Sequence, residues 1–258
     1  MNLEEVMRLI EKRTGISLCG SRLNRIKKLY ETERSLFKDI ERKDMNDPVW
    51  QKIIKAVSVQ ETYFYRDAEV FDCIKNTILP KIVQRNQSIV KIWSAGCATG
   101  EEAYTLAIIA YEVFKGFGKE PKSLIQVLGT DISEDAIRTA KKGLYKDIPM
   151  GSFRKISPEF LRYFDAGESG LRVKEEIREL VSFRVHNLVI PSPPLEDADL
   201  VVCRNVLIYF TDDAKERAYD NLVSSMRKGG FLVLGPLDNP GRGLEKHHCD
   251  RIVYFTKP

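Results

Sequence analysis

The chain has 258 residues, of which 43% are hydrophobic and 30% are charged, and this composition excludes a disordered or collagen-like protein. No apolar run reaches the roughly 18–20 residues that a membrane span needs, and the acidic, polar N-terminus predicts no signal peptide. The five cysteines are scattered and form no C-x-x-C pair, so neither a disulfide framework nor a structural zinc site is expected. We therefore expect a soluble protein of the reducing cytoplasm that binds no metal.

The net charge of +4 lies entirely in the N-terminal fifth of the chain. Residues 1–58 hold 13 Lys and Arg against 9 Asp and Glu, whereas the remaining residues hold 28 of each kind. The basic residues are densest in one predicted helical stretch, at Arg22, Arg25, Lys27 and Lys28. A modest basic helical face can bind nucleic acid, a membrane surface or an acidic protein, although most such faces are only solvated.

The first 58 residues predict a small helical domain. Apolar residues recur at helical spacing over 3–13 and 23–40, and Gly15 suits the left-handed position that ends a helix. Asp47-Pro48 is typical of a helix cap followed by proline at the first helical position. With the linker that follows, we expect this domain to span residues 1–68.

From residue 89 onward, short β-rich runs alternate with helical patterns. This alternation is typical of βαβ units and of a mostly parallel sheet covered by helices on both faces, and we expect it to form one α/β domain over 69–258. The interval 150–180 is charged and breaks the alternation, which predicts a small insertion. The expected strands are 89–93, 125–128, 181–185, 200–203, 231–234 and 252–255, and the expected helices are 101–117, 134–142 and 213–226.

The ends of the predicted strands carry the candidate site, because ligands of an open parallel sheet bind beyond the carboxyl ends of its strands. Gly96 lies in a turn of small residues after the first strand, where the backbone can approach a ligand closely. Asp131 ends the second strand and could accept hydrogen bonds from ribose hydroxyls. The separation of these two residues exceeds the roughly 20 residues of a dinucleotide fingerprint. The pattern therefore predicts an adenosine cofactor without indicating a nicotinamide one.

Further motifs make the chain recognisable. Arg204 and Asn205 are polar residues at the end of a buried strand, and three successive aromatic residues precede Arg66 at the junction of the two domains. Together with the glycine turn, these motifs resemble the chemotaxis receptor methyltransferase (CheR) family from about residue 50 to the C-terminus. The matching segments are 61–67, 93–104, 129–132, 187–188 and 203–210.

The resemblance implies a Rossmann-like, S-adenosylmethionine-dependent methyltransferase with an N-terminal all-α domain and a small β insertion. Arg66 and Tyr209 match the residues placed nearest the reacting methyl group, so they are the expected catalytic residues. Gln60 stands where the family often has Asn, and the choice between Glu101 and Glu102 stays open. By position, the expected cofactor contacts are Gln60, Thr62, Arg66, Gly96, Glu101, Glu102, Asp131, Asn187, Leu188, Arg204 and Asn205.

The resemblance also implies the substrate and partners. Glutamate side chains on the cytoplasmic helices of methyl-accepting chemoreceptors would become γ-methyl esters, with S-adenosylhomocysteine as the second product. The basic face at Arg22, Arg25 and Lys28 would then dock those acidic helices, and the 150–180 insertion could bind a receptor C-terminal tail. We expect a cytoplasmic monomer that binds no nucleic acid.

The same residues allow two other interpretations. A nucleic-acid methyltransferase would use the same cofactor fold, but Pro191-Ser-Pro-Pro-Leu195 lacks the leading acid or amide and the aromatic residue of the amino-methylating motif. An excess of only four positive charges is also small against a phosphate backbone. A non-catalytic regulator that binds S-adenosylmethionine or a receptor is the second alternative, and turnover distinguishes it from the enzyme.

Overall fold

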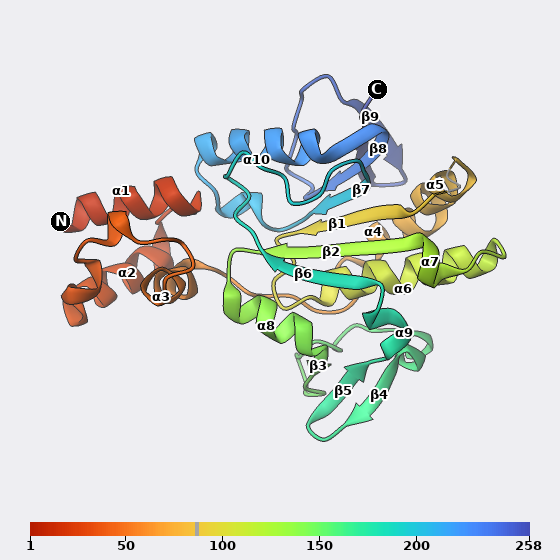
Figure 1. The fold of residues 1–258 in the computed structure, drawn as a ribbon, viewed down its shortest axis with the longest axis horizontal. Coiled ribbons are helices and arrows are strands. Elements are labelled where there is room, and N and C mark those ends of the chain that lie inside the picture. Colours follow the sequence, from red (N-terminus) through yellow and green to blue (C-terminus); the bar gives the residue numbers. More distant parts are fainter. Residues whose placement is uncertain (86–87) are drawn as a thin grey trace.

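The computed structural model describes residues 1–85 and 88–258 (Figure 1). A seven-stranded sheet forms its centre, with the strand order β6-β2-β1-β7-β8-β10-β9. Strands β6, β2, β1, β7 and β8 run parallel, and β10 and β9 follow in antiparallel pairing. The strands are β1 (Val90–Ala95), β2 (Ile125–Asp131), β6 (Val181–Val185), β7 (Ala198–Cys203), β8 (Met226–Leu234), β9 (Glu245–Cys249) and β10 (Ile252–Thr256).

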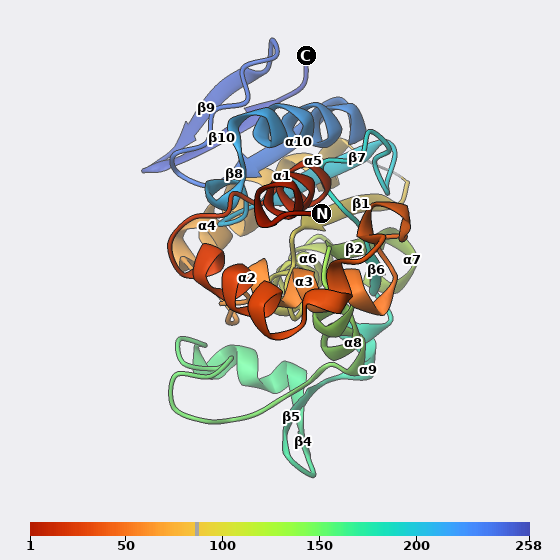
Figure 2. The ribbon, with the colours of Figure 1, turned by 90° about the vertical axis from the view of Figure 1, so that its left-hand side faces the viewer.

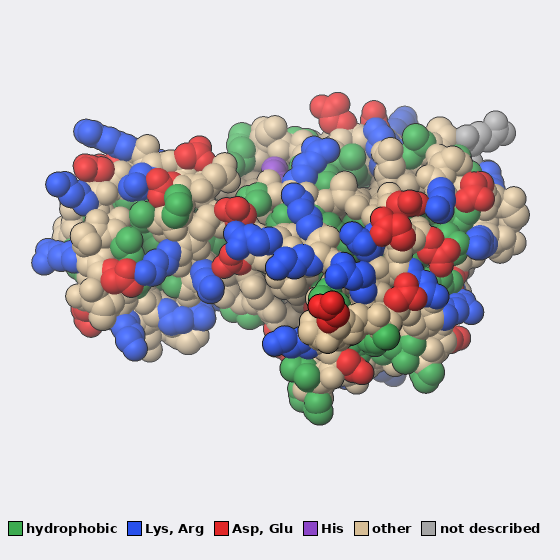
Figure 3. Space-filling model, turned by 60° about the horizontal axis from the view of Figure 1, so that its bottom comes forward, with side chains coloured by type: hydrophobic (Ala, Val, Ile, Leu, Met, Phe, Trp, Pro, Cys, Tyr) green, Lys and Arg blue, Asp and Glu red, His purple; other side chains and the backbone are tan. Residues whose placement is uncertain are grey.

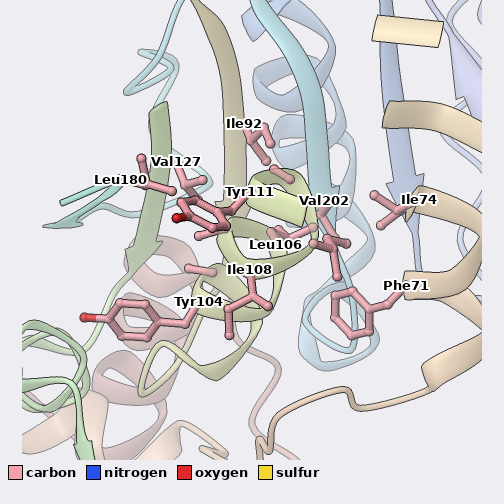
Figure 4. Packing of buried hydrophobic residues seen from close by; sticks show 14 of the residues in the cluster. Phe71, Ile74, Ile92, Tyr104, Leu106, Ile108, Tyr111, Val127, Leu180 and Val202 are labelled. Atoms are coloured by element: carbon pink, nitrogen blue, oxygen red, sulfur yellow. The ribbon is translucent and has the colours of Figure 1, made fainter. Parts of the chain in front are cut away.

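Helices cover both faces of this sheet because its buried strands carry apolar side chains on both sides. Ile92 of β1 packs in one cluster with Leu106 and Ile108 of α6 (Figure 4), whereas its neighbour Trp93 packs in a second cluster with Leu222 of α10. The mostly parallel α/β architecture expected from the sequence is therefore confirmed. The helices of this part are α4 (Ala68–Cys73), a π-helical turn (Ile74–Ile78), α5 (Leu79–Arg85), α6 (Glu101–Gly116), α7 (Pro121–Leu124), α8 (Glu134–Lys142), α9 (Glu175–Arg178) and α10 (Asp212–Ser225).

The N-terminal helices lie at one end of the sheet (Figure 1). Their buried side chains form a third apolar cluster around Trp50. They are α1 (Leu3–Thr14), α2 (Gly20–Thr32) and α3 (Pro48–Val57). Gly15 ends α1 at a φ of 78°, and Asp47 caps α3 by accepting a hydrogen bond from the Val49 amide, as predicted. Of the range 23–40, predicted to be helical, only the part up to Thr32 is α-helix, and two 3-10 turns follow that are separated by Asp39 in a left-handed conformation. These turns are Arg34–Phe37 and Ile40–Arg42.

A second, antiparallel sheet projects from the central one (Figures 1 and 2). It forms in the order β3-β5-β4 and has β4 at an open edge. This sheet begins before the predicted insertion 150–180 and ends within that range. Helix α9, which follows the sheet in the chain, packs against α6. Its elements are β3 (Leu144–Tyr145), a 3-10 helix (Pro158–Tyr163), β4 (Phe164–Gly167) and β5 (Gly170–Val173).

Residues 152–154, which precede β4 of this small sheet, are attached to the segment 61–67 before α4, here called the aromatic motif. The Phe64 amide donates to the Ser152 carbonyl oxygen at 2.9 Å, and the rings of Phe64 and Phe153 stack with centroids 5.2 Å apart. The Arg154 guanidinium lies 3.9 Å from the Tyr63 ring centroid and forms an ion pair with Glu61. The insertion is therefore packed against the motif.

Strand β9 was not predicted, because the run from Glu245 to Cys249 is polar and shows no apolar alternation. It is an edge strand whose pairing comes from β10 alone. His247 lies in β9, with its Nε2 2.8 Å from the Thr256 hydroxyl. Within the described residues, no group of three potential metal ligands gathers and no helix is long and apolar enough to cross a membrane.

The turn after α1 joins the helical end to the α/β part by backbone hydrogen bonds. The Ser17 amide donates to the Tyr209 carbonyl oxygen at 2.8 Å, and the Thr211 amide donates to the Gly15 carbonyl oxygen at 2.9 Å. A Cβ on Gly15 would lie 2.6 Å from Cγ1 of Val189. Glycine is therefore required there both for its φ and for the close packing.

We predict that Gly15→Ala destabilises the protein more than Gly20→Ala does. Gly20 also has a positive φ, of 53°, but an added Cβ would meet no atom within 4 Å. Both variants acquire backbone strain, whereas only Gly15→Ala adds an overpacked contact of about 1–3 kcal/mol. Chemical denaturation measures both free energies of unfolding, and equal losses would show that the contact with Val189 contributes nothing.

Candidate active site

A cleft opens at the carboxyl ends of β1, β2, β6 and β7, where an open parallel sheet binds its ligands. Residues from the aromatic motif, the glycine turn and four strand ends line it, although they are far apart in the chain. Of the residues singled out from the sequence, the cleft is lined by Gln60, Thr62, Arg66, Gly96, Glu102, Asp131, Asn187, Leu188, Arg204, Asn205 and Tyr209.

The glycine turn is held tightly against the end of β2. The amides of Gly96 and Cys97 both donate to the Thr130 carbonyl oxygen at 2.8 Å. Gly96 has a φ of 77°, and an added Cβ would lie 2.4 Å from Cγ2 of Val206. Because Gly96 has no side chain, its backbone forms part of the wall of the cleft. A ligand can therefore approach this backbone closely.

Asp131 is oriented by the same turn. Its carboxylate accepts hydrogen bonds from the amides of Ala98 and Ser133, each at 2.9 Å. Burial raises the pKa of Asp131, and these amide hydrogen bonds oppose the shift. Gln60 lies nearby, because its Nε2 donates to the Ser133 hydroxyl at 2.8 Å. The carboxylate is therefore fixed where ribose hydroxyls could donate to it.

Arg204 connects the parts of the cleft. Its side chain is only 3% exposed and forms ion pairs with Asp67 at 2.6 Å and with Glu102 at 3.3 Å. Its Nη2 also donates to the Arg66 carbonyl oxygen at 2.8 Å. One guanidinium thus joins the end of β7 to the aromatic motif and to the first turn of α6.

The two adjacent glutamates have different surroundings. Glu102 lines the cleft and accepts from the Ser94 hydroxyl at 2.8 Å in addition to its ion pair with Arg204. Glu101 is buried outside the cleft lining, where it accepts from the hydroxyls of Thr99 and Ser152 at 2.7 and 2.8 Å. Burial raises the pKa of both carboxyls. Glu102 therefore lies in the wall of the cleft, and Glu101 lies at the attachment of the insertion.

Residues 60–243 match the family model described as CheR methyltransferase, SAM binding domain. The chain belongs to this family. It is 34% identical to chemotaxis protein methyltransferase 1 of Pseudomonas aeruginosa, over 96% of this chain and 95% of that protein. It is 30% identical to chemotaxis protein methyltransferase Cher2 of Pseudomonas putida, over 100% of this chain and 98% of that protein. A chemotaxis protein methyltransferase 1 of Vibrio cholerae is 33% identical, over 79% of this chain and 75% of its own length.

Membership of the CheR family makes the protein an S-adenosylmethionine-dependent methyltransferase of chemotaxis. The family and the fold expected from the sequence are confirmed, and neither the nucleic-acid methyltransferase nor the non-catalytic regulator is favoured. The cleft fits the cofactor of the family, because it combines the bare backbone at Gly96, the carboxylate of Asp131 and the apolar side chain of Leu188. These groups match the polar and apolar parts of an adenosine.

The two expected catalytic residues lie in this cleft. Tyr209 ends the 3-10 turn Leu207–Tyr209. Arg66 donates to the Glu61 carbonyl oxygen, and its guanidinium lies 6.0 Å from the ring centroid of Tyr63. Both side chains are partly exposed, so a substrate can reach them.

Asn187 is held by the helical part of the chain. Its Nδ2 donates to the Arg13 carbonyl oxygen at 2.7 Å, and its Oδ1 accepts from the Val189 amide at 3.2 Å. The side chain is therefore hydrogen-bonded to the end of α1 through Arg13. Thr14 and Ile16 lie at the end of α1 and just after it, and they also line the cleft. These two residues were not predicted from the sequence.

His186 also lines the cleft and was missed. Its Nε2 is buried and has no hydrogen-bond partner among the described residues, and burial lowers its pKa to about 4. The imidazole is therefore neutral at physiological pH. Its position directly before Asn187, at the end of a strand, is the signal that could have indicated it.

The basic face differs from its prediction at Arg22. Arg25 and Lys28 are exposed, as a docking surface requires. Arg22 is only 9% exposed, and its guanidinium lies over the ring of Tyr209 at 5.0 Å from the centroid. The prediction of Arg22 as an exposed docking residue is wrong, because helical spacing turns this side chain of α2 toward the α/β part.

We predict that Glu102→Gln weakens binding of S-adenosylmethionine and that Glu101→Gln does not. Loss of the Glu102 charge leaves Arg204 without one of its carboxylates and removes a charged acceptor from the cleft. A charged hydrogen bond of about 1.5–3 kcal/mol corresponds to a roughly 10- to 100-fold higher Kd, measurable by calorimetry. Glu101→Gln is the matched control and should lower Tm instead. An unchanged Kd for Glu102→Gln would remove this residue from the site.

Proposed function

We propose that the protein transfers the methyl group of S-adenosylmethionine to glutamate carboxylates on the cytoplasmic helices of chemoreceptors. The products would be glutamate γ-methyl esters and S-adenosylhomocysteine. The observation that carries the proposal is the meeting of Arg66 and Tyr209 in the cleft that Gly96, Asp131 and Arg204 build. The relatives named as chemotaxis methyltransferases support this choice of acceptor.

The cofactor contacts are part of the proposal. Asp131 would accept from the ribose hydroxyls, and the turn at Gly96 would bring its backbone against the cofactor. Leu188 offers an apolar surface for the adenine ring. The remaining proposed contacts, which line the same cleft, are Gln60, Thr62, Arg66, Glu102, Asn187, Arg204 and Asn205.

The acceptor requires little activation. A glutamate with a reference pKa of about 4.3 is already ionised at neutral pH, so the nucleophile forms without a general base or a metal. The cofactor, when bound, supplies an electrophilic methyl group. Arg66 would orient the incoming carboxylate through charge-assisted hydrogen bonds, and the Tyr209 ring would hold the reacting groups in line.

The division of the chain into domains gives each part a role. Residues 1–68 would form a docking domain with its linker, and residues 69–258 would form the methyltransferase domain. Separate apolar clusters around Trp50 and Ile92 support two parts, and Phe64 and Tyr65 of the linker pack in the cluster of the second part. The open edge of β4 could add a strand from a receptor tail. We propose a monomer that acts in the cytoplasm and binds no nucleic acid.

Labelling distinguishes the proposed acceptor from others. The protein is incubated with methyl-labelled S-adenosylmethionine and the membrane fraction of its own cells, and the product is treated with mild alkali. We expect receptor-sized bands to release their label as volatile methanol, because carboxyl methyl esters hydrolyse in alkali. Alkali-stable label on protein or nucleic acid would overturn the proposal.

The same assay tests Arg66. We expect Arg66→Ala to lower kcat roughly 10-fold or more, because a charged hydrogen bond to the acceptor is lost. Tyr209→Phe tests only the hydroxyl group. Wild-type turnover by Arg66→Ala, with normal cofactor binding, would show that Arg66 does not orient the carboxylate.

Charge reversal tests the docking surface. Figure 3 shows Lys and Arg side chains spread over the helical end of the molecule, with fewer acidic ones among them. We expect Arg25→Glu and Lys28→Glu each to raise KM for the receptor about threefold and to weaken its salt dependence. Lys228→Glu, an exposed change in β8, is the control. If Arg25→Glu and Lys28→Glu leave KM unchanged, as the control does, then α2 is only solvated and does not dock the receptor.

A further inference from the structure

Arg22 is a buried cation without an anionic partner. Its side chain is 9% exposed, and among the described residues no carboxylate lies within ion-pair distance of it. Its Nε has no hydrogen-bond partner, and its Nη2 donates only to the Cys19 sulfur at 3.1 Å. Burying such a charge is costly unless another group stabilises it. The face of the Tyr209 ring, 5.0 Å from the guanidinium carbon, is the group that does so.

Tyr209 in turn has few other restraints on its ring. It ends a 3-10 turn of three residues, and its hydroxyl forms no hydrogen bond with the described residues. The preceding Ile208 is 50% exposed, so the turn lies near the surface. Without the guanidinium, the ring could adopt other rotamers while the backbone stayed in place.

The backbone of Tyr209 is held by the same part of the chain. The segment after α1 pairs with the segment after the 3-10 turn through an antiparallel bridge between Ile16 and Phe210. Hydrogen bonds from Ser17 to Tyr209 and from Thr211 to Gly15 flank this bridge. The segment after α1 therefore restrains the backbone of Tyr209, and Arg22 of α2 contacts its ring within the described residues.

We propose that Arg22 is a positioning residue for methyl transfer, which fixes the Tyr209 ring in the cleft by a cation–π contact. The N-terminal helical domain then completes the active site in addition to docking the receptor. Arg25 lies about one turn further along α2 and is exposed, so neighbouring turns of one helix carry the two functions. This proposal rests on the proposed function, because it takes Tyr209 as a catalytic residue.

The test uses Arg22→Met in the full chain, which keeps the length and the apolar stem of the side chain. We expect kcat for receptor esterification to fall roughly 3- to 30-fold, the range that corresponds to a cation–π contact between the exposed and the desolvated limits. The Kd for S-adenosylmethionine and the KM for the receptor should stay within twofold of wild type. Lys27→Met, an exposed change on the same helix, is the matched control and should leave kcat unchanged.

A double-mutant cycle with Tyr209 separates positioning from a general loss of structure. Tyr209→Phe retains the ring, so Arg22→Met should still lower kcat in that background. Tyr209→Leu removes the ring, so Arg22→Met should then have no further effect. Arg22→Lys keeps the cation and should retain part of kcat, and it replaces Arg22→Met in the cycle if that variant does not fold.

The outcomes are distinguishable. An unchanged kcat, an equal loss of kcat in the Tyr209→Leu background, or a change confined to KM would overturn the positioning role. Absence of alkali-labile label with the wild-type protein would instead refute the proposed function itself.

Discussion

The cleft depends on the ion pairs of Arg204, because this one buried guanidinium holds together segments that are remote in the chain. It pairs with Asp67 from the aromatic motif and with Glu102 from α6, and it donates to the Arg66 backbone. Glu102 is the mostly buried partner, whereas Asp67 is half-exposed. Breaking a buried ion pair by removing one partner typically costs about 3–5 kcal/mol, since the other charge stays buried. The position of the Arg66 side chain in the cleft thus follows from a contact made by the residue at the end of β7.

The helical part and the α/β part share the site. Backbone from Gly15 to Ser17 pairs with the turn that carries Tyr209, and the Arg13 carbonyl oxygen fixes Asn187. These contacts are hydrogen bonds with fixed geometry, which differ from the adaptable contacts between loosely joined domains. The family model begins only at residue 60. The contribution of Arg13 and of Gly15 to Ser17 therefore lies outside the segment that matches the model.

The strands and their ends could be predicted because local signals determine them. Buried parallel strands appear as short apolar runs, and the residues that follow them, such as Gly96 and Asp131, must lie at one edge of the sheet. Strand β9 could not be predicted, because its pairing comes from β10 and its own residues are polar. The different roles of Glu101 and Glu102, and the burial of Arg22, depend on partners such as Ser152 and Tyr209 that are remote in the sequence.

The attachment of the small sheet restricts how this enzyme can be shortened or recombined. Ser152, Phe153 and Arg154 pack on the aromatic motif and on Glu101, so they belong to the catalytic core although they precede the inserted strands β4 and β5. Deletion of the whole interval would expose Phe64 and leave the buried Glu101 with one partner fewer. The attachment continues beyond Arg154, because Phe160 packs on Tyr65 and Phe164 packs on Phe64. A chimera that exchanges the insertion for one from another protein should therefore be joined after Phe164, with β3 paired anew to the incoming strand. Only the part of the insertion that follows these attaching residues is exchangeable.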